Sequence, residues 1–318
     1  MTDKTRVRFF IACMAFAAIA VLSASLLSTL KGKGDSRVPR LTEILADSIS
    51  RIADEYPGEI GVAVIIGGSD TVAVNDRAVY PMMSVFKLHQ ALAVCDRLDS
   101  RGISLDTLLS VDRKDLDAHT WSPMLKEHSE NRIALPVSEF LRYTLTLSDN
   151  NASNLMFRRL VDAASTDSYI SQLLPRESFR IEFTESEMSA DHAKAYRNRT
   201  SPLGAAMLVN RLFTDSLVSC GKQDFVKRML LSCGTGIDRI SAPLQDKEGV
   251  KVAHKTGSGY RNERGELVAH NDLAFITLPD GTSYSLAVFV KDFKGDEKEA
   301  SAVIARISEF VYRMVSRR

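Results

Sequence analysis

The placement of strand-forming segments constrains the fold of this chain more than any other feature. A β-branched run at 60–66 leads through a Gly-Gly turn into a second short run at 71–74. Comparable runs return only late in the chain, at 251–256, 272–278 and 283–290. A Pro-Asp-Gly turn separates the last two. The two ends of the chain therefore predict a single antiparallel sheet.

The chain between these ends is mostly helical in pattern, from residue 84 to about 231. Amphipathic helices also open and close the folded part, near 41–52 and 303–314. We therefore expect an α/β (α+β) three-layer sandwich over 41–318, in which helices cover the sheet and a helical lobe of about 84–231 is inserted. The cleft between the sheet edge and that lobe is the natural place for a site.

The first forty residues differ from the rest. Three basic residues precede an apolar run from Phe9 to about Leu30, and Ser23-Ala24-Ser25 supplies small residues for cleavage. This pattern predicts a signal peptide at 1–30, with a retained membrane anchor as the alternative. Residues 31–40 predict a flexible leader. In both cases we expect the folded part to lie outside the cytoplasm.

Charge and metal-ligating residues exclude several classes of function. The chain has 41 Lys plus Arg against 40 Asp plus Glu, so nothing favours nucleic acid or an anionic membrane surface as a partner. Its six histidines form no H-x-H or H-E-x-x-H group, so we expect no metal and no other cofactor. Cys220 and Cys233 could pair in an oxidising compartment, a question that the sequence leaves open. A monomer is the default expectation.

Three short motifs carry the chemistry. In Ser84-Val85-Phe86-Lys87, residues three apart on a helix share a face, so Lys87 can approach the Ser84 hydroxyl as a base. Ser148-Asp149-Asn150 could relay a proton and hold a substrate amide, although the same residue types are favoured helix caps. Lys255-Thr256-Gly257-Ser258 predicts an edge strand that approaches a ligand closely, or simply an exposed edge guarded by a lysine.

Together and in this order, the three motifs resemble the signature of class A β-lactamases and penicillin-binding proteins. The resemblance covers the chain from about residue 41. His254 and the run Ser148 to Asn154 are similar to the cephalosporinase and extended-spectrum branch of class A. It implies that Ser84 is the nucleophile, that its proton is removed by Lys87, by Glu185 through a water, or by both, and that Ser148 protonates the leaving nitrogen. Asn150, Lys255, Thr256 and Ser258 would bind substrate, and the amides of Ser84 and Ser258 would form the oxyanion hole.

A β-lactamase also needs a base for deacylation, which class A supplies from a glutamate in an E-x-x-L-N motif. Glu185 is our first candidate, with Met188 in the leucine position, and Glu187 and Glu182 rank below it. Two positions depart from the family. Ser189 replaces the asparagine that helps to hold the water, and Phe183 replaces an arginine that normally clasps the loop.

The resemblance also implies a second cation for the substrate carboxylate. Arg239, in Thr235-Gly236-Ile237-Asp238-Arg239, is the first candidate, and Arg261 is the alternative. We therefore expect a periplasmic bacterial enzyme that hydrolyses cephalosporins and penicillins through a Ser84 acyl-enzyme and confers antibiotic resistance. A D,D-peptidase and a penicillin sensor without turnover share the three motifs, and are the rival interpretations.

Overall fold

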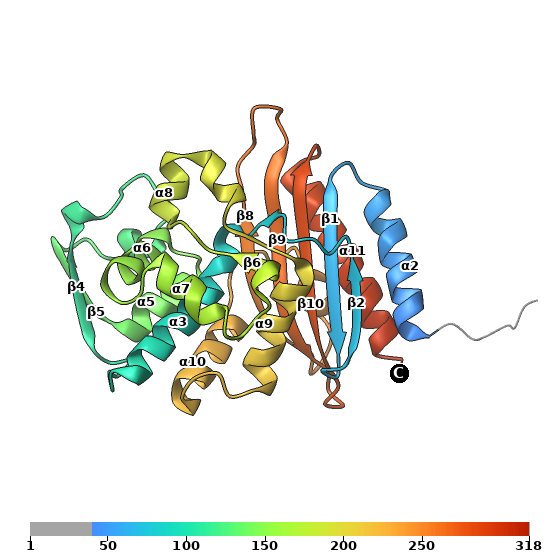
Figure 1. Ribbon diagram of the computed structural model, residues 1–318, viewed down its shortest axis with the longest axis horizontal. Helices are drawn as coiled ribbons and strands as arrows, with labels where there is room; N and C mark the ends of the chain where they lie inside the picture. The colour runs from blue at the N-terminus through green and yellow to red at the C-terminus, as the bar shows by residue number, and fades with distance from the viewer. Residues whose placement is uncertain (1–39, 318) are drawn as a thin grey trace, which may run out of the picture. The chain divides into compact units, whose positions relative to one another are not determined.

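The computed structural model describes residues 40–317, so the predicted signal peptide and all but the last residue of the predicted leader lie outside the described residues. Residues 41–318 form one compact unit. Its centre is a five-stranded antiparallel sheet (Figure 1). In spatial order the strands are β2 (Asp70–Val74), β1 (Glu59–Ile66), β10 (Ser283–Phe293), β9 (Leu267–Thr277) and β8 (Lys251–Ser258).

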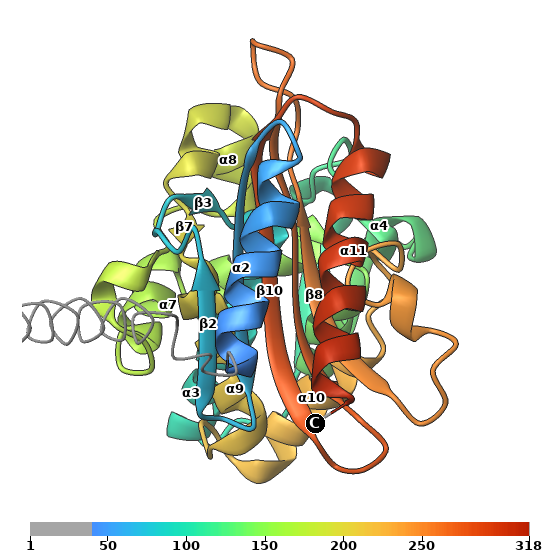
Figure 2. The ribbon, with the colours of Figure 1, turned by 90° about the vertical axis from the view of Figure 1, so that its right-hand side faces the viewer.

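The sheet has a buried layer on each face because its strands alternate. Along β1, Val62 and Val64 join the core on one side, whereas Ala63 and Ile65 join the core on the other. Helices α2 (Leu41–Asp54) and α11 (Glu297–Val315) cover the first face, side by side (Figure 2). Helix α9 (Pro202–Thr214) packs on β10 and β1 from the opposite face.

The remaining elements precede or follow α9 in the segment between β2 and β8, and most of them build the lobe drawn in green in Figure 1. The helices are η1 (Met83–Val85), α3 (Phe86–Ser100), η2 (Arg113–Asp115), α4 (Pro123–Glu127), α5 (Val137–Thr146), α6 (Asn150–Arg159), α7 (Ala163–Ile170), η3 (Arg176–Ser178), α8 (Glu185–Ala190), η4 (His192–Tyr196), α10 (Cys220–Leu231) and η5 (Ala242–Leu244). The strands are β3 (Tyr80–Pro81), β4 (Leu108–Asp112), β5 (Arg132–Pro136), β6 (Phe179–Arg180) and β7 (Arg199–Thr200).

The expected fold class is confirmed, and the sequence missed the small sheets within the helical segment. Strands β4 and β5 pair as a hairpin, and β3, β7 and β6 form a second small sheet. Three of these strands have only two residues, which is too short to show an alternating pattern.

The cysteine question is also answered by the fold. Cys95, Cys220 and Cys233 are all free thiols. Cys220 is the first residue of the twelve-residue helix α10, and Cys233 lies just beyond its end. A helix of that length separates its ends by about 18 Å, far beyond the reach of a disulfide.

Two kinds of feature are absent from the described residues. No helix within residues 40–317 is long and apolar enough to cross a membrane. The same part of the chain holds no cluster of three or more His, Cys, Asp or Glu side chains placed to bind a metal ion.

Candidate active site

Ser84 lies in η1, directly before α3, and its hydroxyl contacts both candidate bases. Lys87 Nζ is 3.0 Å from Ser84 Oγ, and Glu185 Oε1 is 3.1 Å from the same atom. Lys87 and Glu185 form an ion pair of 2.9 Å, and the Lys87 side chain is fully buried. Met83, immediately before the serine, has a φ of 46°, a strained conformation for a residue with a side chain. The fold thus fixes one serine against a lysine and a glutamate.

The Ser-Asp-Asn motif divides its tasks among its three residues. Asp149, not Ser148, caps α6, because its side chain accepts from the Ala152 amide. Ser148 has a φ of 58°, and its hydroxyl accepts a hydrogen bond of 3.1 Å from Lys255. Asn150 Oδ1 lies 2.6 Å from Lys87 Nζ. The helix-cap interpretation is therefore correct for Asp149. Ser148 and Asn150, on either side of it, line the pocket.

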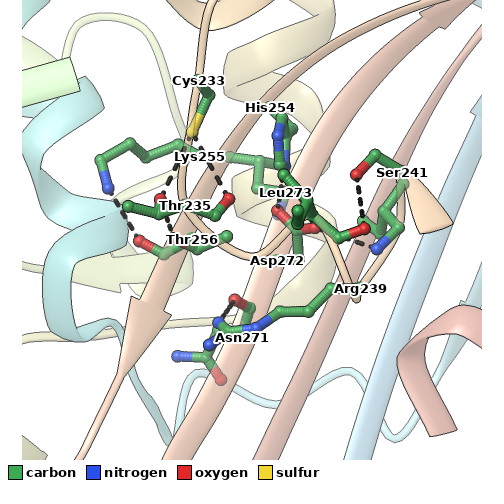
Figure 3. Close-up of polar contacts among 12 residues, drawn as sticks. Cys233, Thr235, Arg239, Ser241, His254, Lys255, Thr256, Asn271, Asp272 and Leu273 are labelled. Carbon is green, nitrogen blue, oxygen red and sulfur yellow. Dashed lines mark hydrogen bonds and ion pairs between the residues drawn. The ribbon is translucent and has the colours of Figure 1, made fainter. Parts of the chain in front are cut away.

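The Lys-Thr-Gly motif lies on β8, the edge strand of the sheet, as the sequence predicts. A Cβ atom at Gly257 would lie 2.4 Å from the Met82 carbonyl oxygen, so glycine lets β8 press against the segment before Ser84. Lys255 is fully buried and donates to Ser148 Oγ and, at 2.9 Å, to its neighbour's carbonyl at Thr256. Figure 3 shows Lys255 and Thr256, two neighbouring residues of β8. Lys255 thus lies behind the cavity lining and contacts it through the Ser148 hydroxyl.

One cavity of about 760 Å³ gathers the predicted residues. Its lining includes Ser84, Ser148, Asn150, Glu185, Arg239, Thr256 and Ser258. Lys87 and Lys255 are not part of that lining and support it from behind. The predicted site residues, distributed over more than 150 positions of the chain, therefore meet at one cleft.

Arg239 is buried against the strand motif, not paired with Asp238 at the surface. Its guanidinium donates to the carbonyls of Gly257 (3.2 Å) and Asn271 (2.7 Å) and to Ser258 Oγ (2.6 Å). Its Nε is buried without a hydrogen-bond acceptor. The alternative, Arg261, instead bonds to the Gly265 and Gly295 carbonyls and does not line the cavity. The geometry therefore favours Arg239 as the cation beside the pocket.

Glu185 is the first residue of α8, and its two rivals are occupied elsewhere. Glu187 closes a capping box with Thr184 at the helix start. Glu182 forms an ion pair of 2.5 Å with Arg197. Met188 is the buried residue of α8, and both Met188 and Ser189 line the cavity.

The loop that carries Glu185 is held without the missing arginine clasp. The side chain of Asn198 accepts from the Glu182 and Phe183 amides, at 2.8 and 3.0 Å, and donates to the Phe183 carbonyl at 2.7 Å. Arg197 and Lys194 also lie over the Phe183 ring. Phe183 therefore removes one ionic contact but keeps the loop anchored through its backbone and its ring.

Sequence reasoning missed the residues that shape the mouth of the cavity. Thr120 accepts from Asn150 Nδ2 at 2.9 Å, and the half-exposed Trp121 donates to the Leu147 carbonyl. The rings of His192 and Tyr260, which line the same cavity, stack with centroids 3.9 Å apart. Trp121 is the only tryptophan of the chain, which was the one available signal.

Lys87 and Glu185 both contact the pocket-lining Ser84. The Ser148 hydroxyl, which is bound by Lys255, lines the same cavity. This arrangement defines a serine hydrolase that works by acyl transfer. Comparison with known proteins extends this result. The model of the "Beta-lactamase enzyme family" matches residues 44–315. A β-lactamase of Phocaeicola vulgatus is 58% identical over 99% of this chain and 98% of its own length. The extended-spectrum β-lactamase PER-1 of Pseudomonas aeruginosa is 32% identical over 85% of this chain and 87% of its own.

Solved structures agree with these matches. TLA-3 extended-spectrum β-lactamase superposes with a TM-score of 0.82 at 33% identity, covering 86% of this chain and 98% of that one. A class A β-lactamase from Bacteroides cellulosilyticus gives a TM-score of 0.83 at 28% identity, covering 88% and 100%. The chain belongs to the class A serine β-lactamases, with extended-spectrum enzymes among its relatives.

Proposed function

We propose that this enzyme hydrolyses the β-lactam ring of cephalosporins and penicillins through an acyl-enzyme on Ser84, and thereby confers antibiotic resistance. The observation that carries the proposal is the contact of one serine hydroxyl with both Lys87 and Glu185. A penicillin-binding enzyme or sensor has only to be acylated by the β-lactam, whereas a β-lactamase needs a second group that can activate water against the ester. Glu185 lines the cavity beside Ser84 and can serve as that group.

The contacts of Lys87 favour Glu185 as the acylation base as well. Besides Ser84 Oγ and Glu185, Lys87 Nζ contacts the Ser148 carbonyl at 2.8 Å and Asn150 Oδ1 at 2.6 Å. All four neighbours are oxygen atoms that can accept, so each of the three N–H groups of an ammonium finds an acceptor. Glu185 can then take the serine proton, directly or through a water, while Lys87 stabilises the developing charge.

The remaining steps follow from the positions of the other groups. Ser84 attacks the lactam carbonyl, and the oxyanion forms beside the amides of Ser84 and Ser258. Ser148, polarised by Lys255, delivers a proton to the departing nitrogen. Arg239 and Thr256, which line the same cavity, bind the substrate carboxylate. Glu185 then activates the water that releases Ser84.

We further propose that the enzyme acts as a monomer in the bacterial periplasm, after export by its N-terminal segment. The basic residues and apolar run of the first thirty positions support export. Membrane contact would be limited to that segment, if it is retained. The extended-spectrum relatives PER-1 and TLA-3 favour cephalosporins among the substrates.

Intact-protein mass spectrometry after mixing with a cephalosporin tests the hydrolase proposal. We expect an adduct on Ser84 that appears and clears while substrate is consumed. In Glu185→Ala the adduct should form and persist, because no group remains to activate the water. Glu187→Ala, two residues further along the same helix, is the matched control and should clear its adduct. A persistent adduct in the unmodified enzyme would instead favour the D,D-peptidase or the sensor, and full turnover by Glu185→Ala would remove Glu185 from its role.

A further inference from the structure

The active-site cavity also has a carboxylate that the proposed reaction does not use. Glu297 is the first residue of α11 and lines the cavity together with Arg239. The other carboxylate of the described lining, Glu185, is paired with Lys87 at 2.9 Å. Glu297 is exposed, and its side chain forms neither an ion pair nor a hydrogen bond within residues 40–317. Its negative charge is therefore available to a molecule in the cavity.

The contacts of α11 place Glu297 at the end of the cavity where Arg239 lies. One turn after Glu297, the Ser301 hydroxyl lies 2.8 Å from His270 Nε2. His270 is the register partner of Ser258 across β8 and β9, and the Ser258 hydroxyl accepts from Arg239 at 2.6 Å. Residues four apart share a helix face, and helical side chains lean towards the N-terminus. Glu297 therefore extends into the cavity at the Ser258 end of β8.

A carboxylate without a partner at this position opposes the binding of a simple anion. In the proposed reaction Arg239 and Thr256, which line the same cavity, bind the substrate carboxylate. The charge of Glu297 repels that carboxylate, because like charges in one cavity raise the free energy of the complex. A substrate that also carries a positive charge turns this repulsion into an attraction. The charge pattern of the cavity therefore favours a substrate with both signs of charge.

On a cephalosporin the ring carbon that bears the carboxylate is bonded to C3, so a C3 substituent lies beside Arg239 once the carboxylate is bound. Some cephalosporins carry a quaternary ammonium group on that substituent. We propose that Glu297 is a specificity-determining residue, which pairs with this cation and favours zwitterionic cephalosporins over anionic ones. The inference rests on the proposed function, in which Arg239 fixes the substrate carboxylate. Glu297 takes no part in the bond changes at Ser84, so its effect falls on KM more than on kcat.

Glu297 also has a local role in its helix. It is an acidic residue in the first turn of α11, and the N-terminus of a helix favours negative charge. That contribution belongs to the folded protein and is the same whichever substrate is present. Its loss would lower the Tm, but it would leave the ratio of kcat/KM between two substrates unchanged. A ratio measured for two matched substrates therefore separates the specificity role from the structural one.

Cefepime and cefotaxime are a matched pair for this test. They share the acyl side chain and the ring carboxylate, and they differ in the C3 substituent, which is a quaternary ammonium group in cefepime and an uncharged acetoxymethyl group in cefotaxime. The measured quantity is kcat/KM for cefepime divided by kcat/KM for cefotaxime. An exposed ion pair changes an equilibrium by about threefold, so Glu297→Gln should lower this ratio by about threefold. Glu297→Lys, which turns the attraction into a repulsion, should lower it by about tenfold, mainly through a higher KM for cefepime.

Two variants and one change of solvent serve as controls. Glu309→Gln should leave the ratio unchanged, because Glu309 is exposed on the same helix and does not line the cavity. Glu297→Asp keeps the charge and should keep the ratio within about twofold of the unmodified enzyme. Added salt should bring the ratio of the unmodified enzyme towards that of Glu297→Gln, since salt screens an exposed charge. Thermal melting of each variant checks that it is folded.

The outcomes separate the two proposals. An unchanged ratio in Glu297→Gln and Glu297→Lys would overturn the inference, while hydrolysis of both cephalosporins would still support the proposed function. If the unmodified enzyme is acylated without turnover, the hydrolase proposal fails. The ratio of the two acylation rate constants, measured by intact-protein mass spectrometry, then tests Glu297 by the same criteria. A chain that is acylated by neither cephalosporin would overturn both proposals.

Discussion

Asn198 lies outside the cavity, yet its side chain anchors the loop that carries Glu185. It is fully buried and bonds to the amides of Glu182 and Phe183 and to the Phe183 carbonyl. Asn198→Ala leaves two amides and one carbonyl without their partner. An unsatisfied backbone group costs about 1 to 3 kcal/mol, and the lower value applies here because Glu182 and Phe183 are half-buried. The expected loss of stability is therefore about 3 kcal/mol.

That loss can be measured by calorimetry. For a domain of this size, 1 kcal/mol corresponds to about 2 °C, so the Tm of Asn198→Ala should fall by about 6 °C. Asn131→Ala, at an exposed position, is the matched control and should melt with the unmodified enzyme. A Tm change of Asn198→Ala below about 1 °C would show that the three bonds do not stabilise the loop.

The kinetic consequence is more specific. A displacement of a catalytic group by about 1 Å can cost about a hundredfold in rate. Because Glu185 takes the serine proton in acylation and activates the water in deacylation, Asn198→Ala should slow both steps by about tenfold to a hundredfold. Stopped-flow measurement of the burst and of the steady state separates these steps. Unchanged rates of both steps in Asn198→Ala would refute the argument that Asn198 acts through the Glu185 loop.

Two further predictions concern buried polar groups. Asp149→Ala removes the acceptor of the Ala152 and Met124 amides. We therefore expect the free energy of unfolding, measured in urea, to fall by about 3 kcal/mol, and kcat to be low. An unchanged unfolding midpoint would contradict this prediction. Burial lowers the pKa of His89 to about 4, so protons bind preferentially to the unfolded chain and stability falls as the pH drops from about 6.5 towards 4. His89→Gln should therefore lose about 2 kcal/mol less between pH 7 and pH 5 than the unmodified enzyme, and an equal loss would exclude His89 as the cause.

Much of the fold was readable from local patterns. The strands at both ends, the helical segment between them, and the edge position of the Lys255 strand follow from alternation, helical periodicity and turn residues. The small sheets β3-β7-β6 and β4-β5 were missed, because two-residue strands have no period and hairpins within a helical segment depend on long-range packing.

The candidate site divides in the same way. Ser84 and Lys87 are close because they share one turn, a relation that sequence spacing predicts. Glu185 was chosen by its resemblance to a family motif, and the structure brings it to Ser84 across 101 positions. Glu187 is held by the capping box of α8, and Glu182 is held by its ion pair with Arg197, so neither reaches Ser84. The sequence spacing alone cannot specify these contacts.

The sequence by itself determined the order of strands and helices along the chain, the class of fold and the three motifs. Each of these depends on residues that are close together in the sequence. Only the tertiary structure decided that Lys255 lies behind Ser148 and that Arg239 is buried against β8. These contacts join segments far apart in the chain, and burial sets their charges. Both effects arise when the strands and the lobe close around the cleft, and no local pattern encodes them.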